Sequence, residues 1–254
     1  MRYVLEIAAN SLESALAAQE GGADRVELCA NLSGGGTTPS YGTIVESRDR
    51  VRIPLYVLIR PRTGDFCYTE SEIETMLRDI SICANAGIDG VVIGALDAQL
   101  AVDARVCSAL IAAAGQLGVT FHRAFDCARD HVHALDTIME LGCERVLTSG
   151  GAATALAGAA RIAQCVKQAR SRLAIMAGAG LDAGNIHEVA VSSTVRELHG
   201  SAKAIRSSLV RNGEVGIPGL EVNCWQTDAT IVRAMVEALT QQASSNSGSA
   251  SNLA

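Results

Sequence analysis

Histidine, arginine and aspartate gather at the polar end of a short apolar run, Val-Thr-Phe-His-Arg-Ala-Phe-Asp at residues 119–126. These side chains can transfer protons, bind anions and orient one another. An apolar run that follows a glycine is typical of a buried strand, and α/β proteins bind ligands at the carboxyl ends of parallel strands. The sequence therefore predicts a functional site at the end of this strand, beside His122, Arg123 and Asp126.

Charged and polar residues also stand in or just after the other apolar runs. Charges inside buried strands are costly unless they are paired, and a guanidinium pairs well with a carboxylate. These residues could form a structural ion-pair layer, but their clustering near one end favours a ligand pocket. Glu27 and His122 are the best candidates for acid–base catalysis. The predicted pocket residues are Glu6, Glu27, Arg60, His122, Arg123, Asp126, Thr148, Ser149, Gly178, Gly180 and His199.

Strand geometry limits which of these side chains can face the same way. Successive residues of a regular strand point to opposite faces, so His122 and Arg123 cannot both point inward if the strand stays regular. We expect Glu6, Glu27, Arg60 and one of that pair inside. The glycine turns at residues 149–151 and 178–180 could supply backbone N–H groups to an anion, although any tight turn also uses glycine.

The elements that must position these residues alternate along the chain. Apolar runs predict strands at residues 3–8, 25–29, 55–60, 90–94, 119–126, 145–148, 173–177 and 196–199. Helical patterns fall at residues 12–20, 42–50, 71–86, 101–117, 132–141, 155–171, 184–191 and 227–241. Eight strand–helix units predict an α/β fold, a single-domain (β/α)8 TIM barrel, with an open doubly wound sheet as the alternative.

One short sequence pattern recurs three times and supports the assignment of alternating strand–helix units. Glycine, one residue, an acid and a new apolar run follow one another at residues 22–26, 87–91 and 142–146. Glycine suits the left-handed position that ends a helix, so each copy reads as a helix-to-strand turn. The barrel domain should span residues 1–242, with a glycine-rich loop at 212–223 and a displaced closing helix at 227–241. Residues 243–254, rich in serine and asparagine, read as a disordered tail.

Composition narrows the possible partners. A net charge of −6 and an aromatic content of 3% argue against nucleic-acid binding and attachment to anionic membranes. The sequence has no run of about 18 apolar residues and no signal-peptide pattern. Eight cysteines without a Cys-x-x-Cys pair are typical of thiols in a reducing compartment, so we expect a cytoplasmic protein.

Several motifs resemble one known family. They are Asn-Leu-Ser-Gly-Gly-Gly-Thr-Thr-Pro-Ser at 31–40, Ile-Arg-Pro-Arg at 59–62, Gly-Asp-Phe at 64–66, residues 120–126, and Arg-Val-Leu-Thr-Ser-Gly at 145–150. In this order they resemble the copper homeostasis protein CutC family over residues 3–203. The resemblance implies a cytoplasmic TIM barrel, often a homo-oligomer, that is associated with copper tolerance and for which copper binding is reported. It implies no established reaction.

The resemblance makes Cys29 the candidate metal ligand. Cu(I) prefers two or three converging sulfur ligands. Cys29 matches a cysteine position of the family, but a second position that holds cysteine in some relatives is Ala8 here. Cys67 or Cys127 could substitute only if their loops fold inward.

Two hypotheses therefore stay open, and the sequence does not decide whether the chain is an enzyme. One is a Cu(I)-binding protein of copper homeostasis. The other is a TIM-barrel enzyme of lyase, isomerase or hydrolase type that acts on a small anionic or phosphorylated substrate.

Overall fold

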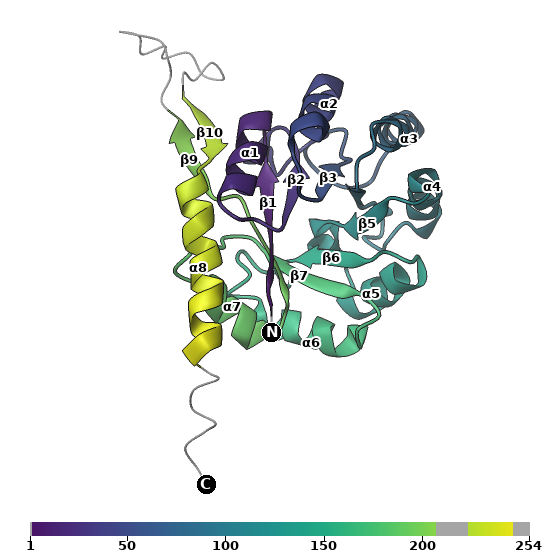
Figure 1. Cartoon of the computed structure of the whole chain (residues 1–254). Coiled ribbons are helices and arrows are strands. Elements are labelled where there is room, and N and C mark those ends of the chain that lie inside the picture. Colours follow the sequence, from purple (N-terminus) through teal and green to yellow (C-terminus); the bar gives the residue numbers. More distant parts are fainter. Residues whose placement is uncertain (1, 207–222, 246–254) are drawn as a thin grey trace.

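Eight parallel strands close into a barrel in the computed structural model, which describes residues 2–206 and 223–245 (Figure 1). Each strand pairs with the next along the chain, and the eighth pairs back with the first. The (β/α)8 barrel is confirmed and the open sheet is excluded. The strands are β1 (Val4–Ala9), β2 (Arg25–Leu28), β3 (Leu55–Leu58), β4 (Gly90–Ile93), β5 (Gly118–Phe121), β6 (Arg145–Thr148), β7 (Ala174–Gly178) and β8 (Glu197–Gly200).

The helices form a ring around the barrel (Figure 1). Side chains cap the free backbone N–H groups at the start of several helices: Ser11 caps the first helix, and Asp103 caps the fourth. The Asp103 cap starts that helix three residues later than predicted. The helices are α1 (Leu12–Glu20), α2 (Tyr41–Arg50), α3 (Glu70–Asn85), α4 (Ala104–Ala114), α5 (His131–Glu140), α6 (Ala159–Ala169), α7 (Ile186–Ser193) and α8 (Ala229–Ser245), with 3-10 helices η1 (Leu32–Gly34) and η2 (Arg123–Cys127).

An antiparallel hairpin separates the last barrel strand from the last helix. It pairs β9 (Lys203–Arg206) with β10 (Cys224–Thr227), and the sequence reading missed it. Helix α8 then contacts α1 and α7 and closes the ring, as the displaced eighth helix should (Figure 1). The predicted loop at 212–223 lies outside the described residues except for its last position. Helix α8 continues to Ser245 and so includes the first residues of the predicted tail. The rest of that tail lies outside the described residues.

The recurring helix-to-strand turns have the expected geometry. Gly22, Gly87 and Gly142 have φ of +91°, +69° and +82°, in the left-handed region that favours glycine. The acid that follows ties the turn to the sheet in two of the copies. Asp24 accepts a hydrogen bond from the backbone N–H of Leu5 in β1 at 2.9 Å, and Asp89 accepts one from the backbone N–H of Leu55 in β3 at 2.8 Å.

Apolar and charged side chains separate across the barrel wall. The large apolar core fills the space between strands and helices, with residues such as Leu5, Ile7 and Val26 on the outer face of the sheet. Inside the barrel, Cys29 belongs to a small apolar cluster with Tyr56, Leu58 and Val92.

Much of the rest of the barrel interior is an ion-pair network that we call the charged layer. Arg25 donates to Glu6 and, over 2.6 Å, to Glu197, and Arg145 donates to Glu197 over 3.0 Å. The structural ion-pair layer, one of the two alternatives that the sequence presented, is therefore present in the barrel interior. The members of the charged layer are Glu6, Arg25, Tyr56, Glu144, Arg145 and Glu197.

Candidate functional site

A cavity of about 650 Å³ lies at the carboxyl ends of the barrel strands. Its wall includes residues from both ends of the chain, because β1 and β8 are neighbours in the closed barrel. Cys29, Leu58, Phe66 and Leu147 add apolar surface to the wall. The predicted pocket residues that line the cavity are Glu27, Arg60, His122, Arg123, Gly180 and His199.

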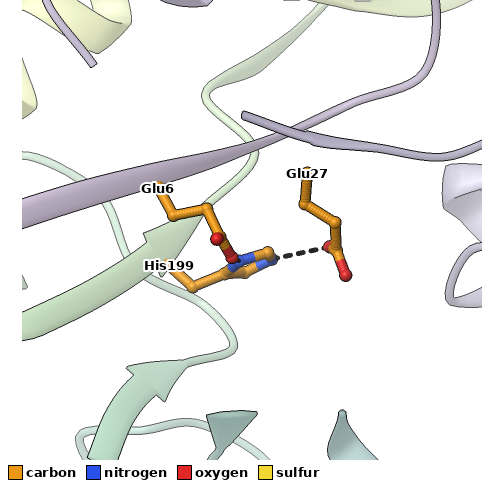
Figure 2. Close-up of side chains that lie close together, drawn as sticks. All are labelled: Glu6, Glu27 and His199. Carbon is orange, nitrogen blue, oxygen red and sulfur yellow. Dashed lines mark hydrogen bonds and ion pairs between the residues drawn. The ribbon is translucent and has the colours of Figure 1, made fainter. Parts of the chain in front are cut away.

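Glu6, His199 and Glu27 form a chain of three side chains that ends at the cavity (Figure 2). The barrel register places Glu6 opposite His199, and their Oε1 and Nδ1 atoms are 2.8 Å apart. The other ring nitrogen, Nε2, lies 3.5 Å from Oε2 of Glu27. Glu6 is fully buried behind the cavity wall, where it also accepts a hydrogen bond from Arg25.

The environment drives the pKa values of these three groups apart. Burial raises the pKa of Glu27 to about 7, and the nearby Glu6 adds to the rise. Burial also disfavours the charged form of Glu6, but Arg25 and His199 outweigh it and lower the pKa of Glu6 to about 2. Burial opposes protonation of His199, and its two carboxylate partners outweigh burial and raise its pKa. Glu6 is thus a fixed anion, and Glu27 is the group that can exchange a proton near neutral pH.

His122 and Arg123 both line the cavity, although a regular strand would turn only one of them inward. Strand β5 ends at Phe121, and His122 serves as the N-cap of η2, so the alternation stops before these residues. His122 Nδ1 accepts from the backbone N–H of Ala124 at 3.1 Å. Burial and the charge of Arg60 lower the pKa of His122 to about 3, so the ring is neutral.

Arg60 does not pair with the glutamates, contrary to our expectation. It donates to the backbone carbonyl oxygens of Gly34, Gly36 and Gly64 at 3.2, 2.7 and 2.9 Å, and so ties together the loops after β2 and β3. Among residues 2–206 and 223–245, no carboxylate forms an ion pair with it. Arg60 therefore brings an unneutralised positive charge to the cavity wall, which favours an anionic ligand.

Four further predicted pocket residues do not line the cavity but lie next to its wall: Asp126, Thr148, Ser149 and Gly178. Asp126 accepts hydrogen bonds from Thr148, Ser149 and Gly151 and pairs with Arg123 at 2.8 Å. This joins the loops after β5 and β6. Gly178 has no side chain, which leaves room for the side chain of His199. A Cβ atom at position 178 would lie only 3.2 Å from the Cβ of His199.

Sequence reasoning missed the arginine that actually pairs with the glutamates. Arg25 lies two residues before Glu27 on β2, so the alternation that turns Glu27 inward turns Arg25 inward as well. Arg145 on β6 and Glu197 on β8 complete the same layer. A search for charges at alternate positions within strands, rather than at strand ends, would have found them.

The donor atoms near the cavity can be judged by the ligands that Cu(I) prefers, which are sulfur atoms. Burial, and next the charge of Glu27, raise the pKa of the Cys29 thiol well above its usual value, so the thiol stays protonated. Among the described residues, one group of three potential metal-ligating side chains converges within reach of a single ion: Glu6, Glu27 and His199. Its oxygen and nitrogen donors suit a divalent ion better than Cu(I), which prefers sulfur.

Comparison with known proteins gives a consistent family. The CutC family model matches residues 3–204. A CutC family protein of Xylella fastidiosa (strain Temecula1) is 52% identical over 94% of this chain and 90% of its own length. One from Xanthomonas campestris pv. campestris (strain B100) is 51% identical over 92% of this chain and 98% of its own.

Solved structures agree with these relatives. The CutC crystal structure from Streptococcus agalactiae, named as a copper homeostasis protein, has a TM-score of 0.75 and 32% identity over 78% of this chain and 98% of its own. Phosphoribosylanthranilate isomerase from Thermotoga maritima has a TM-score of 0.56 at 12% identity, over 94% of this chain and 99% of its own, which shows the barrel fold alone. None of the described helices combines the length and apolar character that a membrane crossing requires.

Proposed function

This chain belongs to the CutC family, a family linked by name to copper homeostasis, and we propose that it is an enzyme for a small anionic substrate. The observation that carries the proposal is the Glu6–His199–Glu27 chain, which ends at a cavity whose wall holds the unpaired cation Arg60. Acid–base chemistry needs a proton carrier that is held in place, and an anionic substrate needs a positive counter-charge.

Each residue has a defined part in this proposal. Glu27 gives and takes the proton, since it ends the chain at the cavity. His199 holds Glu27 in place through Nε2, and Glu6 fixes the orientation of the His199 ring through Nδ1. Arg60 attracts the anion. The volume of the cavity suits a small metabolite.

The test compares turnover by native protein and by Glu27→Gln. Each is incubated with the anionic small-metabolite fraction of a bacterial extract, and mass spectrometry follows the individual compounds. We expect the native protein to deplete at least one anion that Glu27→Gln leaves intact. Glu140→Gln, an exposed substitution on α5, is the matched control and should behave as native. Equal profiles for native protein and Glu27→Gln would refute an enzymatic role for Glu27.

Copper binding is the second candidate, and the observation that favours it is the convergence of Glu6, Glu27 and His199, whose oxygen and nitrogen donors suit a divalent copper ion. In this case the ion is the cargo of the protein. Cys29 also lines the cavity and could add a sulfur ligand if its thiol loses the proton.

An anaerobic Cu(I) titration against a competing chelator decides this case. Native protein is compared with Cys29→Ser and with His199→Gln. Tight binding of about one ion per chain that Cys29→Ser abolishes would establish a Cu(I) site centred on Cys29. Weak binding that neither variant changes would remove direct copper binding from the proposal.

The proposal also includes the compartment and the assembly. All eight cysteines are free, which supports the reducing cytoplasm as the site of action. A homo-oligomer stays a prediction that light scattering on the full chain can test.

A further inference from the structure

Two buried hydrogen-bond donors at the cavity wall have no partner among the described residues: Nε of Arg60 and Nε2 of His122. Only 6% of Arg60 and 5% of His122 is exposed. The other polar atoms of both side chains are engaged, by glycine carbonyl oxygens and by the Ala124 N–H. A buried donor without an acceptor is unfavourable, so two of them beside one cavity mark a place for a ligand atom.

The protonation of His122 follows from its backbone contact. Nδ1 accepts a hydrogen bond from Ala124 and so carries no proton. The neutral ring then holds its single proton on Nε2, which can only donate. Arg60 Nε is likewise a donor without acceptor capacity. Each of these two N–H groups therefore needs an acceptor, such as an oxygen with free lone pairs.

Phe66 contacts both side chains. Its ring lies 5.0 Å from the guanidinium carbon of Arg60 and 5.0 Å from the ring centre of His122. Phe66 also lines the cavity, and it lies in the loop between β3 and α3, outside any helix or strand. Phe66 therefore packs against the side chains that carry both donors.

We propose that Arg60 Nε and His122 Nε2 form a two-donor subsite for the carbonyl oxygen of a small anionic substrate, and that Phe66 covers this subsite until the substrate enters. The inference rests on the proposed function, because it assigns a substrate class to that same cavity. It goes further in assigning His122 a direct contact with the substrate, as a neutral hydrogen-bond donor.

This arrangement supports proton transfer next to a carbonyl group. The Glu27 carboxylate takes the proton from the carbon beside the carbonyl, and the C–H electron pair becomes the C=C bond. The carbonyl π pair moves to the oxygen, whose negative charge accepts hydrogen bonds from Arg60 and His122. Both donors keep their protons, and Glu27 returns its proton to the same carbon, which restores the carbonyl group. A neutral histidine donor opposite a carboxylate base is a known solution for this chemistry in another TIM-barrel enzyme, triosephosphate isomerase.

The test uses oxalate, a planar mimic of the enolate of a 2-oxo acid, in metal-free buffer. Protein with ¹⁵N-labelled histidine is titrated with oxalate and followed by NMR. We expect the Nε2–H proton of His122 to shift downfield on binding. His122→Phe should weaken oxalate binding by about 10- to 100-fold, the effect of losing one hydrogen bond to a charged acceptor. His133→Phe, an exposed change on α5, should have no effect.

Two further variants separate a donor role from a packing role. His122→Gln keeps an N–H donor and should retain most of the affinity, whereas Phe66→Ala removes the cover and should raise the association rate. Oxalate binding that leaves the His122 signal unchanged and survives His122→Phe would overturn the subsite. So would absence of binding to both native protein and Phe66→Ala. The turnover comparison with Glu27→Gln is read separately, so failure of the subsite and failure of the proposed function remain distinguishable.

Discussion

Two arginines in the barrel, Arg25 and Arg60, are buried to the same degree but in opposite surroundings. Arg25, in the charged layer, has carboxylates of Glu6 and Glu197 as partners. Among the described residues, Arg60 at the cavity forms no ion pair: it donates to backbone carbonyl oxygens and faces the ring of Phe66, and its Nε has no hydrogen-bond partner. The exposed fractions, 7% and 6%, are almost equal.

The difference separates structural charge from functional charge. A buried cation with two carboxylate partners is compensated within the protein and has little to offer a ligand. A buried cation held by dipoles alone keeps its field, and the adjacent cavity is where an anion can use it. The charged layer should therefore govern stability, and the cavity wall should govern binding. Each prediction below tests one side of this contrast.

Arg25→Met should give the largest loss of stability. It leaves Glu6 and Glu197 without the guanidinium that both contact. Removing one partner of a buried ion pair costs about 3–5 kcal/mol of unfolding free energy. Urea denaturation measures the change. Arg2→Ala, which removes an exposed ion pair with Asp24, should cost less than about 1 kcal/mol. Equal losses in the two variants would contradict the structural role of the charged layer.

Arg60→Met should cost less stability and more binding. The change leaves loop carbonyl oxygens without a donor, at a cost of about 1–3 kcal/mol by urea denaturation. It also removes the unneutralised charge, so oxalate binding measured by calorimetry should be lost. Arg105→Met, at an exposed arginine on α4, is the control and should bind as native. Native-like oxalate binding by Arg60→Met would break the contrast between the two arginines.

Glu27→Gln should change how stability depends on pH. The pKa of Glu27 is about 7 in the folded protein, above its ordinary value of 4.5, so the protonated form favours folding. Native stability should therefore fall as pH rises from 4.5 to 6.5, on the order of 1–2 kcal/mol. Glu27→Gln, which cannot lose a proton, should not show this fall.

The window separates Glu27 from its neighbours. The lowered pKa of Glu6 gives stability that is lost only as pH falls below 4.5, and the raised pKa of His199 acts above its ordinary value of 6.5. Urea denaturation at several pH values measures the slope. The same slope in native protein and variant would show that Glu27 does not titrate in this range.

The sequence predicted the fold better than the site, for a physical reason. Apolar runs and glycine turns depend on local chain geometry, so alternation and the Gly22-type turns pointed to the barrel. The partner of Glu6 depends on register between β1, β2 and β8, which no local pattern contains. Strand alternation does not apply at His122, because β5 ends one residue earlier and the histidine caps η2. The hydrogen-bond partners of Arg60, a predicted pocket residue, were missed because they are loop carbonyl oxygens, which are the same for every residue type.

Tyr56→Phe should cause the smallest loss of stability among these variants. It separates the contribution of the Tyr56 hydroxyl from that of the Tyr56 ring. The hydroxyl donates to Glu144, while the ring lies 5.4 Å from the guanidinium carbon of Arg25 and 5.0 Å from that of Arg145. Phenylalanine removes only the hydrogen bond, so the loss should be about 0.5–1.5 kcal/mol. Tyr56→Leu also removes the ring that both arginines face and should cost clearly more by urea denaturation. Oxalate binding should stay unchanged in Tyr56→Phe, because the hydroxyl donates to Glu144 and Tyr56 is not among the residues that line the cavity. If Tyr56→Phe kept its stability but lost oxalate binding, the charged layer would also govern binding. The contrast between Arg25 in the charged layer and Arg60 at the cavity wall would then fail.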